Sequence, residues 1–353
     1  MKILVTGCAG FIGTNFVYYY IRKYKDCFIV GLDKLTYAGN LQNLSNLRDE
    51  EKDRFVFVKG DINNVELVSY LFSIYDFDVI VNFAAESHVD RSIFDPSVFI
   101  LTNVMGVQSL LSVAMNFWKK GDEWKSGKKF IQVSTDEVYG SLGPEGYFTE
   151  TTPLDPHSPY SSSKAGGDLI AKSYYDTFGM PVVITRCSNN YGPYQFPEKL
   201  IPLMIWNAIN HRDLPVYGDG KNIRDWLYVE DHCEAIDLVI EKGKPGEVYN
   251  IGGHNERENI YVVKKIIEIL RKKTGDNKIN EGPIKFVKDR PGHDRRYAMD
   301  PTKIIKELGW KHSVTFEDGL EMTIDWYLNN LSWIESVISG EYLKFYEKNY
   351  SNR

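Results

Sequence analysis

Short apolar runs alternate with longer amphipathic stretches along the first two thirds of the chain. The short runs are rich in Val, Ile and Phe, and their continuous hydrophobicity predicts strands that are buried on both faces of a sheet. Stretches of helical length follow several of these runs, as helices follow strands in parallel sheets. The pattern predicts an α/β fold: a doubly wound parallel sheet of Rossmann type with a smaller α/β domain interleaved toward the C-terminus. The strands of the large sheet are expected near residues 2–6, 28–32, 54–58, 78–83, 129–133 and 181–186.

A glycine-rich turn follows the first predicted strand and precedes an apolar helix. Gly7, Gly10 and Gly13 form a GxxGxxG pattern, which allows a tight turn and lets the backbone approach a pyrophosphate at the start of the helix. The second strand ends at Asp33, 20 residues after Gly13. An acidic residue at this position binds the ribose hydroxyls and repels a 2′-phosphate. The sequence therefore predicts NAD, rather than NADP, as the cofactor.

A cluster of polar residues, Thr135, Asp136 and Glu137, follows the predicted strand at 129–133. Ligands bind at the carboxyl ends of parallel strands, so we expect these side chains to face a ligand. Adjacent carboxylates raise each other's pKa, which suits acid and base catalysis. Alternatively, one carboxylate caps a neighbouring helix or pairs with a lysine.

Tyr160 and Lys164 lie at the start of a predicted helix that extends to about residue 178. They are four positions apart and therefore project from one face of the helix. A lysine beside a phenol stabilises the phenolate, so we expect Lys164 to lower the pKa of Tyr160 and make it a general base near neutral pH. The YxxxK pattern is common by chance, but here it follows a dinucleotide fold and the strand-end Thr135.

The second part of the chain changes character after Cys187. It is richer in Pro, Gly and aromatic residues, it lacks a second glycine turn, and its loops concentrate arginines, which suit a diphosphate. The predicted domains are an NAD-binding domain at residues 1–189, with parts returning from about 222–252, a mainly sugar-nucleotide-binding domain at 190–330, and a helical tail at 331–353.

Composition is ordinary for a soluble globular protein and excludes several function classes. The 353 residues are 43% hydrophobic and 25% charged, and a net charge of −6 argues against nucleic-acid binding. The apolar runs are expected to be too short to span a bilayer, and no signal peptide is expected. The four cysteines form no CxxC pair, so neither a metal site nor a disulfide framework is predicted, and a cytoplasmic location is expected.

Five segments of the chain resemble the nucleotide-sugar 4,6-dehydratases, which are extended members of the short-chain dehydrogenase/reductase superfamily. Thr135, Tyr160 and Lys164 are similar to the catalytic residues of that superfamily; Ser162 departs from the family, which usually has alanine there. The resemblance covers about residues 1–310. The five segments are residues 84–92, 135–140, 189–193, 224–226 and 289–293.

The resemblance implies a role for each residue of the catalytic group. Asp136 is implied as the acid, Glu137 as the base at C5 of the sugar, and Tyr160 as the base at the C4 hydroxyl. Lys164 is implied to hold the nicotinamide ribose, and Thr135 to bind the substrate oxygen.

The resemblance also implies two sets of binding residues. The NAD contacts, in addition to the glycine turn, are expected at Phe11, Ile12, Asp33, Lys34, Leu35, Thr36, Asp61, Ile62, Phe83, Ala84, Ala85, Glu86, Ser87, Thr102, Tyr160, Lys164 and Asn190. The sugar-nucleotide contacts are expected at Ser87, Thr135, Asn189, Lys199, Leu200, Pro215, Tyr217, Arg224, Asn259, Asp289, Arg290 and His293.

The implied reaction is the dehydration of dTDP-glucose to a 4-keto-6-deoxy sugar nucleotide with tightly bound NAD, a step of dTDP-rhamnose and other deoxysugar biosynthesis. UDP-glucose stays open as the substrate, because thymine and uracil differ by one methyl group, worth about 1 kcal/mol in a fitted pocket. A sugar-nucleotide 4-epimerase is a weaker alternative, since it has no use for an acid and a base at positions 136 and 137. A non-catalytic NAD-binding regulator is a further alternative, against which Tyr160 and Lys164 argue.

Two predicted helices, at residues 96–118 and 160–178, carry more apolar residues than one face of a sheet requires. The family pairs such helices across a two-fold axis, so the resemblance implies a homodimer. Neither a membrane nor a nucleic acid is expected as a partner.

Overall fold

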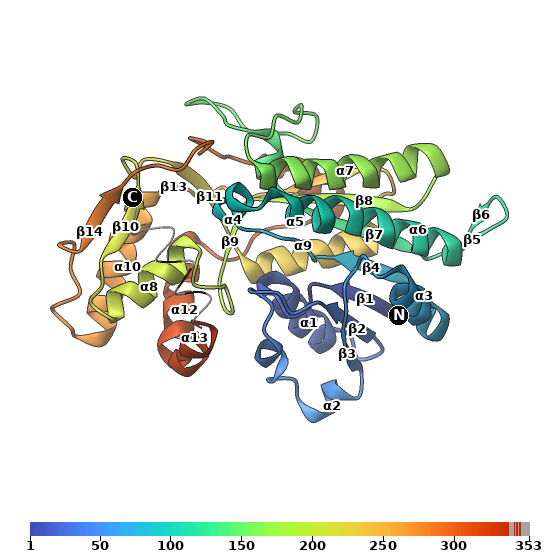
Figure 1. The fold of residues 1–353 in the computed structure, drawn as a ribbon, viewed down its shortest axis with the longest axis horizontal. Coiled ribbons are helices and arrows are strands. Elements are labelled where there is room, and N and C mark those ends of the chain that lie inside the picture. Colours follow the sequence, from blue (N-terminus) through green and yellow to red (C-terminus); the bar gives the residue numbers. More distant parts are fainter. Residues whose placement is uncertain (339–341, 343, 345, 347–353) are drawn as a thin grey trace.

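The computed structural model (Figure 1) describes residues 1–338, 342, 344 and 346. Its large sheet contains β1 (Lys2–Thr6), β2 (Phe28–Asp33), β3 (Phe55–Lys59), β4 (Val79–Asn82), β7 (Lys129–Thr135), β8 (Val182–Cys187) and β12 (Val248–Ile251). These seven strands are all parallel and lie in the order β12-β8-β7-β4-β1-β2-β3. The order confirms the predicted doubly wound Rossmann-type sheet.

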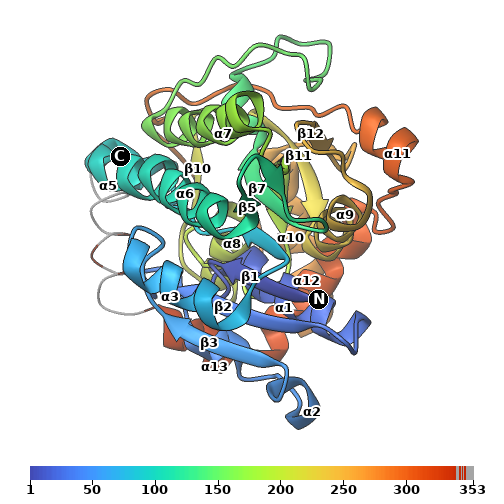
Figure 2. The same cartoon turned by 90° about the vertical axis from the view of Figure 1, so that its right-hand side faces the viewer.

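Helices cover both faces of the large sheet, as Figure 2 shows. Successive side chains of a strand point to opposite faces, so each face has its own core. Ile3 and Val5 of β1 pack with α1 and α9 on one face, whereas Leu4 packs with α3, α6 and α7 on the other. These helices are α1 (Phe11–Lys23), α3 (Val65–Tyr75), α6 (Gly106–Trp118), α7 (Pro159–Phe178) and α9 (Val229–Lys242).

A smaller unit with its own core lies beside the large sheet, at the left of Figure 1. Its strands are β9 (Asn189–Tyr191), β10 (Leu214–Tyr217), β11 (Ile223–Tyr228), β13 (Glu256–Glu258) and β14 (Ile284–Val287). β10 pairs with β14, and β11 lies between β9 and β13. The core of this unit is completed by α8 (Leu200–Ile209), α10 (Asn259–Thr274) and α12 (Phe316–Asn329).

The chain passes between the two units more than once. β11 belongs to the smaller unit, whereas α9 follows it directly and packs on the large sheet, where β12 then pairs with β8. The domain boundaries at residues 189 and 330 stay a prediction. Of the predicted tail, α13 (Leu331–Val337) is a helix, and most of the remainder, from 339 on, is outside the described residues.

One long helix corrects an expectation from the sequence. α5 (Pro96–Ile100), a π-helical segment at Leu101–Met105 and α6 form a stretch of 23 residues that is long and apolar enough to cross a membrane. The expectation that every apolar run is too short to span a bilayer was therefore wrong. Half of the most apolar window of this helix is buried inside the molecule, because α6 packs on the sheet. Such burial is typical of a core helix in a globular protein.

Candidate active site

The carboxyl ends of the parallel strands surround a cavity of about 290 Å³. It lies where the strand order reverses between β1 and β4, the place at which doubly wound sheets bind ligands. A second cavity of about 150 Å³ extends from it into the smaller unit. Glu137, Asn189 and Lys199 line both cavities, which are therefore two parts of one cleft.

The glycine turn after β1 brings bare backbone to the edge of the larger cavity. Gly7 has a φ of +67°, and a Cβ at this position would lie 2.7 Å from the nitrogen of Ala84. A Cβ on Gly13 would lie 2.1 Å from the Gly7 carbonyl oxygen. No side chain caps the N-terminus of α1, so its free N–H groups are available to an anion such as a pyrophosphate.

Asp33, at the end of β2, is held in a fixed orientation. Its carboxylate accepts hydrogen bonds from the backbone nitrogens of Ala9, at 2.9 Å, and Leu35, at 2.8 Å. Burial raises the pKa of Asp33, and these two hydrogen bonds oppose the rise. A carboxylate has further lone pairs for the ribose hydroxyls. The geometry therefore fits the predicted preference for NAD, whose ribose carries no 2′-phosphate.

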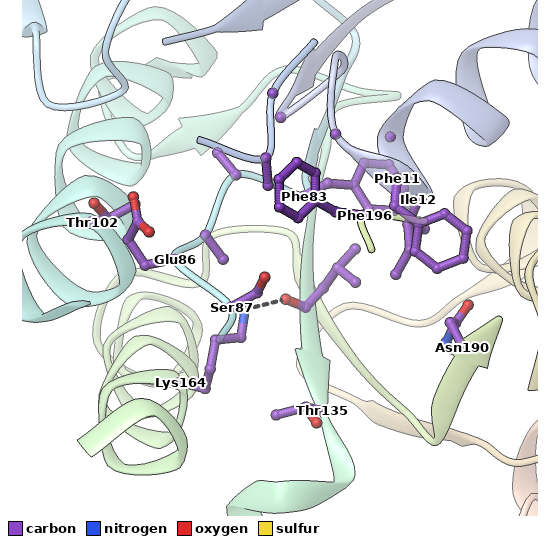
Figure 3. A pocket seen from close by; sticks show the side chains of 18 of the residues that line it. Phe11, Ile12, Phe83, Glu86, Ser87, Thr102, Thr135, Lys164, Asn190 and Phe196 are labelled. Atoms are coloured by element: carbon purple, nitrogen blue, oxygen red, sulfur yellow. Dashed lines mark hydrogen bonds between the residues drawn. The ribbon is translucent and has the colours of Figure 1, made fainter. Parts of the chain in front are cut away.

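Glu86 and Thr102 line another side of the same cavity, and Phe11, Ile12, Phe83 and Phe196 gather at its apolar end (Figure 3). Asn103, beside Thr102 in the π-helical segment, connects parts of this wall by hydrogen bonds. Its amide donates to the Glu86 carbonyl oxygen at 3.0 Å and to the Ser163 hydroxyl at 2.8 Å, and it accepts from the Glu86 nitrogen at 2.9 Å. The π-helical turn thereby joins the end of β4 to α7.

Asp136 and Glu137 follow β7 in a short 3₁₀ turn at Asp136–Tyr139. The Thr135 hydroxyl donates to Asp136 Oδ1 at 3.0 Å and accepts from the Glu137 nitrogen at 3.3 Å, so it fixes both residues. Burial and the neighbouring Glu137 charge raise the pKa of Asp136 well above its usual value. Asp136 Oδ2 is buried and has no hydrogen-bond partner among the described residues. Burial and the neighbouring charge thus favour the protonated form of Asp136, which suits a general acid.

Glu137 differs from Asp136 in its surroundings. Burial raises its pKa, and the positive charges of Arg290, Lys199 and Arg224 oppose that rise. It lines both cavities. The pKa of both carboxyl groups is raised, but three cations oppose the rise at Glu137, so the adjacent pair can serve as an acid, Asp136, and a base, Glu137, at one site.

Tyr160 and Lys164 lie one turn apart on α7, and both line the larger cavity. Lys164 Nζ donates to the Val133 carbonyl oxygen of β7 at 2.7 Å (Figure 3). Burial, followed by the Glu137 charge, raises the pKa of Tyr160 well above its usual value. The expectation that Lys164 lowers this pKa toward neutrality is therefore wrong for the arrangement seen here, since the ammonium group is bonded to the strand rather than to the phenol.

Cations surround the smaller cavity. Lys199 Nζ donates to the Ser87 carbonyl oxygen at 2.8 Å, and burial lowers the pKa of Lys199. Arg224 is buried and Arg290 partly buried, and the Nε of Arg290 has no hydrogen-bond partner among the described residues. The Arg290 guanidinium, with this donor beside the buried Arg224, is suited to a diphosphate.

The structure brings nearly all of the predicted site residues into this cleft. The two exceptions are Leu35, whose nitrogen bonds to Asp33, and Asp289, whose carboxylate contacts His293 Nδ1 at 2.6 Å; neither lines a cavity. Residues that line the cleft but were not predicted include Gln195, Phe196, Glu198, His88 and Asp90. Their only signal in the sequence is that they are neighbours of predicted residues.

Several known proteins are similar to this chain along most of its length. Residues 4–323 match the family model described as GDP-mannose 4,6 dehydratase. The chain is 53% identical over 342 residues to the dTDP-glucose 4,6-dehydratase of Xanthomonas campestris pv. campestris strain B100, which covers 96% of both chains. It is 50% identical over 363 residues to an Escherichia coli enzyme of the same name, which covers 100% of both.

This chain belongs to the dTDP-glucose 4,6-dehydratase family. Solved structures agree with this assignment. The dTDP-glucose 4,6-dehydratase of Bacillus anthracis in complex with NAD superposes with a TM-score of 0.85 at 50% identity, over 96% of this chain and 99% of that one. A UDP-glucose 4-epimerase of Thermotoga maritima has a TM-score of 0.82 at 28% identity, over 94% of this chain and 100% of that one. The fold is thus shared between dehydratases and epimerases, and the side chains in the cleft must decide the chemistry.

Proposed function

We propose that this protein converts dTDP-glucose to dTDP-4-keto-6-deoxyglucose with NAD as a tightly bound cofactor. The observation that carries the proposal is the position of Asp136, a buried carboxyl group whose pKa is raised, beside Glu137 in the same cavity as Tyr160 and Lys164. Oxidation of a sugar hydroxyl requires only the tyrosine and lysine. The removal of water requires an acid and a base in addition.

The residues of the larger cavity fit NAD. Gly7 and Gly13 expose backbone at positions where a Cβ would collide with neighbouring backbone atoms, and Asp33 presents a fixed carboxylate at the end of β2. When bound, NAD supplies the hydride acceptor for C4 of the sugar and the hydride donor for C6. Every proton transfer is then left to the side chains of this chain.

Tyr160 is proposed to exchange the proton of the C4 hydroxyl, while Thr135 hydrogen-bonds the same oxygen. Since burial keeps the phenol of Tyr160 protonated, it must first lose its proton to act as a base. Lys164, on the same face of α7, is the cation that can stabilise the resulting phenolate if Nζ turns from the Val133 carbonyl oxygen toward it.

The C4 ketone acidifies the proton on C5. Glu137 is proposed to remove that proton, because three surrounding cations favour its ionised form. Asp136 is proposed to protonate the C6 hydroxyl so that it leaves as water, because burial and the Glu137 charge favour its protonated form. After the hydride returns to C6, Glu137 gives a proton back to C5. The two carboxyl groups thus end each turnover in the protonation states in which they began, once solvent has restored the Asp136 proton.

Purified protein and dTDP-glucose, without added oxidant, test this function. Alkali should develop the absorbance of a keto sugar from the product. A 4-epimerase would give a sugar nucleotide of changed configuration and no such absorbance, and a non-catalytic NAD-binding protein would give neither. A parallel assay with UDP-glucose decides the nucleotide, for which a preference of about fivefold is expected from one buried methyl group.

The same proposal includes a homodimer. Apolar side chains are exposed on α5 and the adjoining π-helical segment, and α7 adds Leu169, which is 60% exposed. Exposed apolar residues on neighbouring helices are typical of an interface between subunits. The exposed side chains on the long helix are Val98, Ile100, Leu101 and Met105. A dimer mass by light scattering at micromolar concentration supports this arrangement, and a monomer mass excludes it.

The cellular setting is part of the proposal as well. Cys8, Cys27, Cys187 and Cys233 are all free and buried, which suits a reducing compartment such as the cytoplasm. The product is an activated deoxysugar precursor, so dTDP-rhamnose biosynthesis is the proposed pathway. Deletion of the gene should abolish rhamnose incorporation into surface polysaccharide and leave glucose incorporation intact.

A further inference from the structure

A pair of side chains outside the predicted site joins the segment at residues 289–293 to the start of α7. His157 precedes the N-cap of α7, and Asp294 directly follows the cation-bearing residues 289–293. His157 Nδ1 lies 2.5 Å from Asp294 Oδ1. The other oxygen of the Asp294 carboxylate accepts a hydrogen bond from the Tyr297 hydroxyl at 2.6 Å. Asp294 is buried, whereas the imidazole of His157 remains partly open to solvent.

Asp294 also holds a cation of the smaller cavity. Its carbonyl oxygen accepts a hydrogen bond from Arg224 Nη2 at 2.9 Å, and the guanidinium carbon of Arg224 lies 4.2 Å from the centre of the Tyr297 ring. Asp294 therefore contacts Arg224, a candidate for diphosphate binding, through its carbonyl oxygen. Through its carboxylate it contacts His157, just before the start of α7.

Backbone contacts make this connection stiff. Gly292 packs so closely on the His157 carbonyl oxygen that a Cβ would lie 2.9 Å from it. Nearby, the Arg295 nitrogen donates to the Ser141 hydroxyl at 2.9 Å, and the Leu142 nitrogen donates to the Arg296 carbonyl oxygen at 3.0 Å. On the other side, Ser158 caps α7 two residues before Tyr160. A displacement of Asp294 would thus reach Tyr160 through a few rigid residues.

We propose that His157 and Asp294 are positioning residues that couple the binding of a nucleoside diphosphate at Arg224 and Arg290 to the placement of Tyr160. The inference rests on the proposed function, because it requires a sugar nucleotide whose diphosphate binds in the smaller cavity. Binding of the diphosphate at Arg224 and Arg290 fixes residues 290–294. Through the His157–Asp294 contact, it also fixes the start of α7. Neither residue touches the reacting atoms.

The protonation state of His157 sets the strength of this contact. Asp294 raises the pKa of His157, with a further contribution from Asp155, whose Oδ2 lies 3.4 Å from Nε2. Tyr297 meets the Asp294 carboxylate as a neutral donor, and Arg224 meets the Asp294 backbone. Below its pKa, His157 is a cation paired with a carboxylate; above it, only a neutral hydrogen bond remains. The coupling should therefore weaken as pH rises through the raised pKa of His157.

His157→Gln is the variant that tests the coupling, because glutamine keeps a hydrogen-bond donor but cannot carry the charge. His211→Gln is the matched control: His211 Nε2 also pairs with a carboxylate, Asp276 Oδ2 at 3.3 Å, and its side chain is 43% exposed against 41% for His157. Neither pair lines a cavity of the cleft, but His211 and Asp276 follow the ends of α8 and α10 and so lie on neither α7 nor the segment at residues 289–293. Dissociation constants for dTDP are measured by calorimetry on each holoenzyme from about pH 6 to about pH 9.

The ratio of the dTDP dissociation constants of His157→Gln and the unmodified protein should be about threefold at the acidic end and fall toward one at the alkaline end, as expected for one partly exposed ion pair. The ratio for His211→Gln should stay near one throughout. In single-turnover mixing with saturating dTDP-glucose, His157→Gln should also slow NADH formation at acidic pH, an effect that weaker binding alone would not produce. In an Asp294→Asn background, His157→Gln should have no further effect.

Two results overturn the coupling. A ratio for His157→Gln that is independent of pH, or equal to that of His211→Gln, shows that the contact is only structural. If His157→Gln forms NADH at an unchanged rate with saturating dTDP-glucose, diphosphate binding at Arg224 and Arg290 does not affect the placement of Tyr160. Failure of the unmodified protein to bind dTDP would overturn the proposed function itself, and with it the inference.

Discussion

The two parts of the cleft are built in different ways. The cofactor part is made of strand ends, bare glycine backbone and the start of one helix, and Asp33 is fixed there by two backbone N–H groups. The substrate part is made largely of side chains from the smaller unit, and it holds Lys199 from the start of α8, Arg224 from β11 and Arg290 from a loop.

This difference suits two ligands with different lifetimes. Backbone atoms at a sheet edge cannot move without disturbing the core, so the cofactor part is preorganised for a group that stays bound. Cationic side chains can exchange protein partners for phosphate oxygens at each turnover; Lys199, for example, donates to the Ser87 carbonyl oxygen, a partner that a phosphate oxygen can replace. Asp136 and Glu137 lie at the junction, where the chemistry must take place.

The largest effect is expected at the junction from Tyr160→Phe. Loss of the hydroxyl should slow the first oxidation about 1,000-fold, the range typical of a lost general base. The amount of bound NAD and the affinity for dTDP should stay within about twofold, because phenylalanine keeps the aromatic ring that lines the larger cavity and removes no cation of the smaller one. Single-turnover formation of NADH and calorimetry measure the two quantities. A comparable loss of dTDP affinity would show that the two parts are not separate.

Asp136→Asn and Glu137→Gln should reduce overall turnover by about 100-fold or more. Both side chains act after C4 has been oxidised, so NADH should still form and should accumulate at 340 nm. Rapid mixing with absorbance detection distinguishes this outcome. If either variant loses NADH formation as severely as Tyr160→Phe, the assignment of Asp136 and Glu137 to the elimination is wrong.

The pH dependence of turnover should reveal the neutral state of Asp136. Its pKa is raised by burial and by Glu137, so the acid is present below that raised pKa and is lost above it. The elimination rate should therefore fall about tenfold per pH unit on the alkaline side. The apparent pKa belongs to the pair, because the two carboxyl groups titrate together. Asp136→Asn should remove this alkaline fall; if the fall persists, another group is the acid.

Arg290→Lys should weaken dTDP binding about tenfold, because lysine lacks the fork of donors that matches a diphosphate. The amount of copurified NAD should not change, which separates the substrate part from the cofactor part. Loss of NAD from Arg290→Lys would contradict the separation of the substrate part from the cofactor part.

Asp289→Asn should have the smallest effect, about twofold or less on dTDP affinity. Its carboxylate is 40% exposed, contacts the buried His293 side chain at 2.6 Å and lines neither cavity, so only one indirect contact to the smaller cavity is lost. The same calorimetric titration as for Arg290→Lys measures it. An effect as large as that of Arg290→Lys would mean that Asp289 contacts the substrate directly.

The cofactor part of the site could be predicted from the sequence almost completely. Strand, glycine turn, helix and acidic residue are local features, and a parallel sheet places strand ends together by rule. Gly7, Gly13 and Asp33 occupy the places that such a pattern requires. The parallel, doubly wound character of the sheet followed from the same alternation of strands and helices.

The substrate part was harder to predict because long-range packing decides it. No local pattern shows that His88 and Asp90 reach the same cavity as Arg224, or that Asp289 turns away from it. The charge state of Tyr160 was also missed, since spacing places Lys164 on the same helix face but cannot show that Nζ bonds to Val133 of β7. The membrane-length helix was missed because the apolar runs were considered separately. In the structure they join in one continuous helix at residues 96–118.

The central claim is that one cleft contains both the oxidation and the elimination, so that the hydride taken from C4 returns to C6 of the same sugar. A mixture of dTDP-glucose carrying deuterium at C4 and unlabelled substrate of distinguishable mass tests it by mass spectrometry and NMR. The deuterium should appear at C6 of the molecule from which it came, and a reaction in heavy water should place deuterium at C5, where Glu137 returns an exchangeable proton. Deuterium scrambled between molecules, or lost to solvent, would contradict the claim.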